Sequence, residues 1–76
     1  MASCQVYGNK PDTGPGQLSA QSAMDDVNEA HTTWAVTMNW TADKTTYTSN
    51  AAGVTGDDLE QAFSPYFQGY HVVGSD

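Results

Sequence analysis

Basic residues are almost absent from this sequence. It contains two lysines and no arginine against nine aspartates and glutamates, which gives a formal net charge of −7 over 76 residues. A protein that binds nucleic-acid phosphates needs clustered Lys and Arg, because the release of counterions supplies most of the affinity. Lys10 and Lys44 stand alone in the sequence, so we expect no direct binding to nucleic acid.

Large aliphatic residues are also scarce, since the chain has two leucines and no isoleucine. A domain of this size buries only about 60% of the surface that its unfolded chain exposes, so the core must be thin. Aromatic side chains can each bury roughly 150–250 Å² and are expected to fill it. The expected aromatic anchors are Trp34, Trp40, Phe63 and Phe67.

Long apolar runs and secretion signals are missing as well. No stretch approaches the roughly 20 apolar residues of a membrane span, and the first residues have neither a basic nor an apolar segment. We therefore expect one small acidic domain, residues 1–76, in the cytoplasm, or in the host cytoplasm if the protein is viral, with no membrane partner.

Catalytic and metal-binding patterns are absent from the sequence. Cys4 is the single cysteine, so it forms no internal disulfide, and we expect it to be buried in a strand. His31 and His71 have no second ligand at a three- or four-residue offset, which favours structural roles. Adjacent aspartates on a helix point about 100° apart and cannot act as a dyad. We expect no enzymatic activity, no cofactor and no metal.

The first half of the chain predicts a strand, a loop, a helix and a second strand. Residues 3–7 alternate as a strand, and the Gly- and Pro-rich stretch 9–16 predicts a surface loop. Apolar residues at three- and four-residue steps predict a helix over 19–31 with Ser19 as its N-cap. Strict alternation over 33–41 predicts a strand.

The second half predicts a hairpin, a helix and a last strand. A turn at 41–44 leads into a Thr-rich strand over 45–51, whose inward face is either Thr45, Tyr47 and Ser49 or Thr46 and Thr48. Thr55 and Asp58 have the spacing of a capping box, and Pro65 ends the helix that follows near Ser64. Residues 70–73 form the final strand, and 74–76 are expected to be a frayed end.

The resulting order β-α-β-β-α-β predicts an α+β fold of the ferredoxin-like (split βαβ) class. Two helices would cover one face of a small antiparallel sheet whose first and third strands are central. The rival is a three-stranded sheet with an unpaired N-terminus. The expected core consists of Met24, Val27, Trp34, Val36, Met38, Leu59, Phe63 and Val72.

The same order occurs in RNA-recognition modules, where aromatics on the two central strands stack bases. Tyr7 and Tyr47 lie on the corresponding strands here. The third strand nevertheless lacks the basic-Gly-aromatic signature of that family, and a charge of −7 repels phosphates. Ordinary sheet tyrosines are the favoured interpretation.

An acidic binding surface remains as the main functional hypothesis. Carboxylates on both helices could form one negative face that docks on a basic, nucleic-acid-binding surface of a partner protein. Small acidic inhibitors from phages and mobile elements, including many anti-CRISPR proteins, act in this way, which is an analogy of size and charge. The candidate partner-binding carboxylates are Asp25, Asp26, Glu29, Asp57, Asp58 and Glu60.

Two aromatics next to the hairpin add to this surface hypothesis. Trp40 and Tyr47 would be interface hot spots if they stay partly exposed. The alternative is a structural or self-assembling protein, such as a virion or scaffold component, that forms homo-oligomers through aromatics and a Thr-rich edge strand at 45–51.

Overall fold

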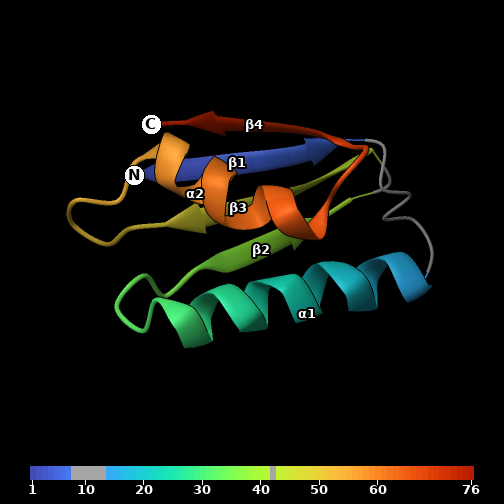
Figure 1. Cartoon of the computed structure of the whole chain (residues 1–76), viewed down its shortest axis with the longest axis horizontal. Coiled ribbons are helices and arrows are strands. Elements are labelled where there is room, and N and C mark those ends of the chain that lie inside the picture. The colour runs from blue at the N-terminus through green and yellow to red at the C-terminus, as the bar shows by residue number, and fades with distance from the viewer. Residues whose placement is uncertain (8–13, 42) are drawn as a thin grey trace.

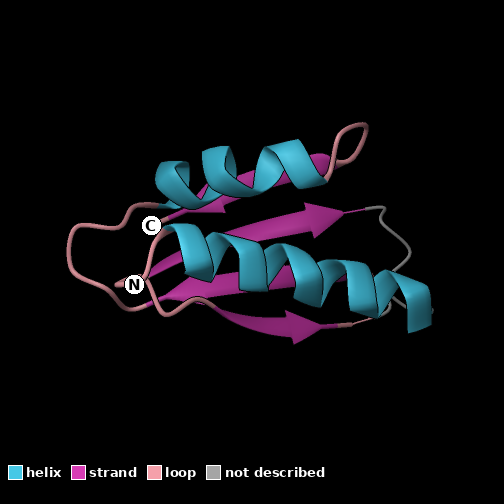
Figure 2. Cartoon of the chain, turned by 60° about the horizontal axis from the view of Figure 1, so that its bottom comes forward, coloured by secondary structure: helices cyan, strands magenta, loops and turns pink. Residues whose placement is uncertain are grey.

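In a computed structural model the chain forms a four-stranded antiparallel sheet and two helices (Figure 1), described for residues 1–7, 14–41 and 43–76. The sheet order is β2-β3-β1-β4, so β1 and β3 are central. Both helices lie over the same face of the sheet (Figure 2). The elements are β1 (Ala2–Tyr7), α1 (Gly14–Ala30), β2 (Thr37–Trp40), β3 (Lys44–Ser49), α2 (Gly56–Phe63), the 3-10 turn η1 (Ser64–Tyr66) and β4 (His71–Ser75).

The predicted element order and the central position of the first and third strands are confirmed. The three-stranded rival is wrong, because β1 pairs on both sides. Cys4 lies opposite Tyr47 of β3 and opposite Gly74 of β4. The N-terminal strand therefore lies in the interior of the sheet.

The register decides the facing of β3, which the sequence left open. Thr45, Tyr47 and Ser49 are buried under the helices, whereas Thr46 and Thr48 point to the uncovered face. The Thr-rich strand also lies between β1 and β2, so its expected place at an edge is wrong. The edges of the sheet are β2 and β4.

Tyr47 occupies the centre of the core. Its hydroxyl donates to the carbonyl oxygen of Ala20 in α1 at 2.7 Å. Its ring stacks on Phe63 of α2, with centroids 3.8 Å apart, and lies 6.2 Å from the ring of Phe67. One side chain of the sheet thus contacts both helices.

The eight residues predicted for the core all belong to the core. Four are buried: Val27, Val36, Leu59 and Phe63. The other four are half-buried and pack against the buried ones: Met24, Trp34, Met38 and Val72.

The first helix begins earlier than predicted. It starts at Gly14 rather than after Ser19, so positions 14–16 of the expected loop are helical and Ser19 is not an N-cap. Proline is tolerated in a first helical turn, where its missing N–H has no helical partner to lose. Pro15, which contributed to the prediction of a loop, is therefore compatible with a position in the first turn of α1. Positions 9–13 of the expected loop lie outside the described residues.

The second strand is shorter than predicted, because a turn occupies its expected first residues. The Trp34 N–H donates to the His31 carbonyl at 3.0 Å, and Ala35 has a positive φ of 49°. The side-chain amide of Asn28 in α1 then hydrogen-bonds to both the backbone N–H and the backbone carbonyl of Val36. Its Oδ1 accepts from the Val36 N–H at 2.8 Å, and its Nδ2 donates to the Val36 carbonyl at 3.0 Å. Regular pairing begins at Thr37.

The C-terminus is not frayed as predicted. Strand β4 continues to Ser75, and its Gly74 lies against the start of α2. The Gly74 N–H donates to Glu60 Oε1 at 2.9 Å, and the Gly56 N–H donates to Asp76 Oδ1. A Cβ on Gly74 would overlap the carbonyl oxygen of Gly56, which is backbone and cannot turn aside. Two glycines thus let the last strand and the second helix touch through their backbones.

We predict that Gly74→Ala destabilises the fold by about 2 kcal/mol or more, because the new methyl group meets backbone atoms that must shift. Urea unfolding followed by circular dichroism measures the change. The neighbouring exposed substitution Ser75→Ala is the control and should stay within about 0.5 kcal/mol of the wild type. Equal stability of Gly74→Ala and wild type would contradict this contact.

Candidate functional site: an acidic groove between the helices

The acidic residues of α1 are exposed, as predicted, but they point in different directions. Asp26 and Glu29 line a hollow of about 420 Å³ together with Ala30 and Tyr66, so this hollow lies between α1 and η1. Asp25 is exposed and is not part of its lining. Successive helical residues differ by about 100° in direction, which accounts for the separation of Asp25 from Asp26.

The acidic residues of α2 are separated in the same way. Asp58 completes the predicted capping box, which the structure confirms: its Oδ2 accepts from the Thr55 N–H at 3.1 Å, and its own N–H donates to Thr55 Oγ1. Asp57 Oδ2 accepts from Gln61 Nε2 at 2.8 Å on the exposed surface. Glu60 is half-buried, and its Oε1 accepts from the Gly74 N–H of β4, so it is less open to a partner than Asp57 and Asp58, and its part in one negative face stays a prediction.

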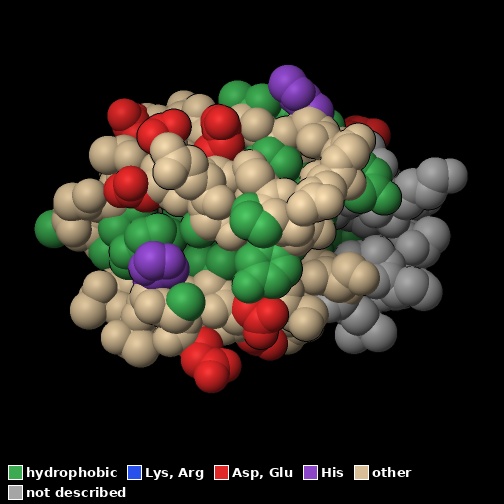
Figure 3. Space-filling model, in the orientation of Figure 1, with side chains coloured by type: hydrophobic (Ala, Val, Ile, Leu, Met, Phe, Trp, Pro, Cys, Tyr) green, Lys and Arg blue, Asp and Glu red, His purple; other side chains and the backbone are tan. Residues whose placement is uncertain are grey.

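Asp58 faces a second hollow, of about 300 Å³, at the C-terminal end of α1. We call the two hollows together the acidic groove. Figure 3 shows the helical face, with acidic side chains above and below a band of hydrophobic ones, and no Lys or Arg side chain of the described residues on it. The second hollow is lined by His31, Trp34, Asp58, Gln61 and Ala62.

An aromatic pair forms one wall of the second hollow. The rings of His31 and Trp34 are stacked, with centroids 3.8 Å apart and planes 10° from parallel. The turn that ends α1 brings them together, and the Trp34 carbonyl accepts from Ser49 Oγ of β3 at 2.7 Å. The sequence alone predicts structural roles for both residues. Their three-residue spacing at a helix end was the available signal, but stacking also depends on the turn before Ala35.

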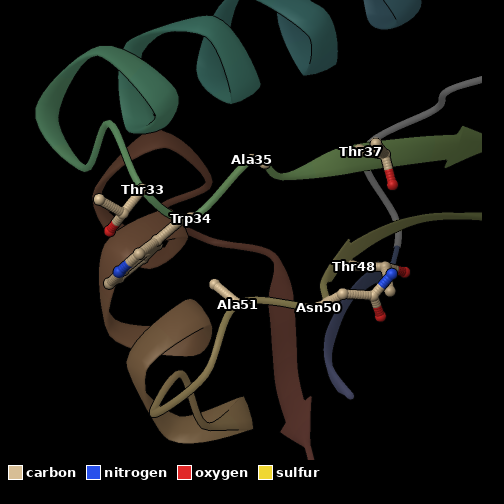
Figure 4. Close-up of a pocket in the computed structure, with 7 residues that line it drawn as sticks. All are labelled: Thr33, Trp34, Ala35, Thr37, Thr48, Asn50 and Ala51. Atoms are coloured by element: carbon tan, nitrogen blue, oxygen red, sulfur yellow. The ribbon is translucent and has the colours of Figure 1, made fainter.

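A third hollow lies at the other side of the same turn, where the loop before β2 meets the loop after β3. Its lining carries no charged side chain and encloses about 280 Å³. In Figure 4 the Trp34 ring points away from Thr37 and Thr48. The indole therefore belongs to the acidic groove. The third hollow is lined by Thr33, Trp34, Ala35, Thr37, Thr48, Asn50 and Ala51.

The two aromatics proposed as hot spots lie outside the groove. Tyr47 is fully buried, so it cannot contact a partner, and that part of the hypothesis is wrong. Burial also removes it from the uncovered face, where base stacking would need it. Trp40 is half-buried on the helix-covered side of β2 and lines neither hollow. Its buried Nε1 has no hydrogen-bond partner among the described residues.

The opposite, uncovered face of the sheet carries Lys44, the one Lys or Arg among residues 1–7, 14–41 and 43–76. Its Nζ lies 5.8 Å from the centre of the Tyr7 ring, and Tyr7 lies 5.9 Å from the His71 ring. The described lysine and the groove carboxylates are thus on different sides of the molecule.

Among the described residues, burial in the core shifts the pKa of two groups, Cys4 and Tyr47. Burial raises the pKa of the Cys4 thiol from its ordinary value of 9.0 to about 12, and the negative charge of Glu60 adds to the rise. Burial, with a contribution from Cys4, also raises the pKa of the Tyr47 phenol above 10.0. A thiol held protonated in a core is a poor nucleophile. This environment fits a packing role for Cys4.

Within the described parts of the chain, no group of three or more His, Cys, Asp or Glu side chains is placed to hold a metal ion. Neither of the two described helices has the length and apolar character needed to cross a bilayer.

Comparison of the chain with protein-family models, with curated proteins and with solved structures gave no match.

We predict that stability falls as the pH rises above about 9. Below that pH the thiol is protonated in both states, whereas above it the unfolded state loses the proton that folded Cys4 retains up to about pH 12. The free energy of unfolding should then fall by up to about 1.4 kcal/mol per pH unit. Urea unfolding between pH 8 and 11 measures the slope.

The control for this prediction is Cys4→Ala, which removes the titrating thiol from the core. Tyr47 contributes only above about pH 10, where unfolded tyrosine ionises. The variant should therefore show a flatter profile between pH 9 and 10. An identical slope in the variant and the wild type would contradict the assignment to Cys4.

Proposed function

We propose that this chain is a non-enzymatic protein-binding module that docks on a basic surface of a partner protein through its acidic groove. The observation that carries the proposal is the placement of three carboxylates in two hollows. Asp26 and Glu29 line the hollow between α1 and η1, and Asp58 lines the one between α2 and the C-terminal end of α1. The three carboxylates are exposed hydrogen-bond acceptors that line hollows beside aromatic rings. Such an arrangement suits protruding cationic side chains.

The charge distribution supports the same choice of partner. The described lysine, Lys44, lies on the other face, so it does not neutralise the groove. With a formal charge of −7, the chain attracts basic surfaces at long range and repels nucleic acid. Such a charge pattern accelerates association and helps to select the partner.

We assign the fold to the ferredoxin-like class, an assignment that the strand order β2-β3-β1-β4 supports. The basic surfaces that best match an acidic protein are those that otherwise hold nucleic acid. The proposed activity is therefore inhibition of a cytoplasmic nucleic-acid-binding complex, such as a host defence complex.

The alternative, self-assembly through strand edges, has less support. The Thr-rich strand β3 is central, and the available edges are the four-residue β2 and the five-residue β4. Glu60 binds the Gly74 N–H of β4, which occupies a donor that a second copy would need.

The proposal is tested by neutralising the groove and measuring the affinity for nona-lysine peptide by calorimetry. We predict that the groove variant binds at least about tenfold more weakly than the wild type, because charge-assisted contacts at the hollows are lost. The affinity of the wild type should also fall as the Debye length shrinks from about 10 Å at 0.1 M salt to about 3 Å at 1 M. The groove variant combines Asp26→Asn, Glu29→Gln and Asp58→Asn.

The matched control removes the same number of charges from exposed carboxylates that line neither hollow. It should lose less than about threefold in affinity, because it changes net charge without removing a carboxylate that lines either hollow. Equal losses in the two variants would contradict a localised site. A salt-resistant oligomer that neither variant alters would favour self-assembly instead. The control combines Asp25→Asn, Asp43→Asn and Asp57→Asn.

A further inference from the structure

We infer that the hollow beside the His31–Trp34 stack is an arginine-selective anchor for the basic partner. This inference rests on the proposed function and goes further, because it distinguishes arginine from lysine and assigns the distinction to one place in the groove. The hollow joins a stacked aromatic pair, a carboxylate and a side-chain amide in about 300 Å³.

The aromatic wall is held in place before any partner arrives. Trp34 is half-buried against the core, and Ser49 Oγ donates to its carbonyl at 2.7 Å. His31 is exposed and lies parallel to Trp34, so the outer face of the stack is open to solvent. A planar guanidinium stacks well on such a face, and pre-organised rings lose little conformational entropy on binding.

The polar wall presents hydrogen-bond acceptors. The capping box uses one acceptor position of the Asp58 carboxylate and fixes its orientation at the start of α2. An ionised carboxylate has about four such positions, so others remain for a ligand. Gln61 donates its Nε2 to Asp57, which leaves the carbonyl end of its amide as the acceptor for the hollow.

Acceptors beside an aromatic face match the guanidinium group more closely than an ammonium group. Arginine presents five donors in a planar fork that can stack and bind a carboxylate at the same time. Lysine carries a compact, strongly hydrated charge that gains less from a flat ring. The volume is close to the lower limit of small-molecule sites, about 300 Å³, and suits a single side chain.

The neighbouring hollow lacks this combination. Asp26 and Glu29 supply two carboxylates beside Tyr66, but without a stacked ring pair or an amide in its lining. It offers charge to lysine and arginine alike. Selectivity is therefore expected at the His31–Trp34 hollow alone, with the other hollow contributing affinity for either cation.

The experiment compares nona-arginine with nona-lysine, which carry the same charge, by calorimetry on the full chain. The wild type is expected to bind nona-arginine at least about fivefold more tightly. In a ¹H–¹⁵N spectrum, nona-arginine should shift the indole signal of Trp34 and leave that of Trp40 in place. Asp58→Asn should reduce the preference to less than about twofold while it keeps an oxygen acceptor for the capping box.

The matched control is Asp25→Asn, which removes one charge from an exposed carboxylate that lines neither hollow and should retain the preference for arginine. A preference that persists in Asp58→Asn would overturn the anchor. Equal, salt-sensitive binding of both peptides would also overturn the anchor and leave the proposed function standing. Failure of both peptides to bind at low salt would instead overturn the proposed function, and the anchor with it.

Discussion

Both helices are held against the sheet by contacts that converge on Tyr47. Its hydroxyl donates to Ala20 of α1, and its ring stacks on Phe63 of α2. A chain with two leucines and no isoleucine has few other large side chains for this task. A buried ring supplies apolar area, and its polar tip is satisfied by a backbone carbonyl. Tyr47 thus links the two helices that carry the carboxylates of the acidic groove.

The acidic groove results from the amphipathic character of the two helices. The apolar stripe of each helix packs on the sheet, which leaves carboxylates at the border between α1 and α2. There Asp26, Glu29 and Asp58 lie beside rings that end each helix: the His31–Trp34 stack after α1 and Tyr66 after α2. Local capping and packing thus place exposed carboxylates beside aromatic rings without a dedicated loop. The single described lysine lies on the opposite face and does not neutralise these carboxylates.

Signals between neighbouring residues predicted much of this fold. The alternation of β1, the Thr55–Asp58 capping box and the end of α2 near Pro65 could all be recognised from short patterns. The facing of β3 could not, because Thr residues on both faces gave Tyr47 no local preference. The direction of Glu60 depends on Gly74, fourteen residues away, and the His31–Trp34 stack depends on a turn with positive φ at Ala35. Such features depend on tertiary contacts that periodicity does not encode.

The central claim is that a basic ligand binds along the groove between α1 and α2. Mapping of backbone amide shifts during titration of the ¹⁵N-labelled chain with nona-arginine tests it most directly. The account predicts shifts concentrated over residues 26–34 and 58–66, with the outward-facing residues of β1 and β3 unchanged. Shifts centred on the uncovered face of the sheet, or spread evenly over all exposed carboxylates, would contradict it.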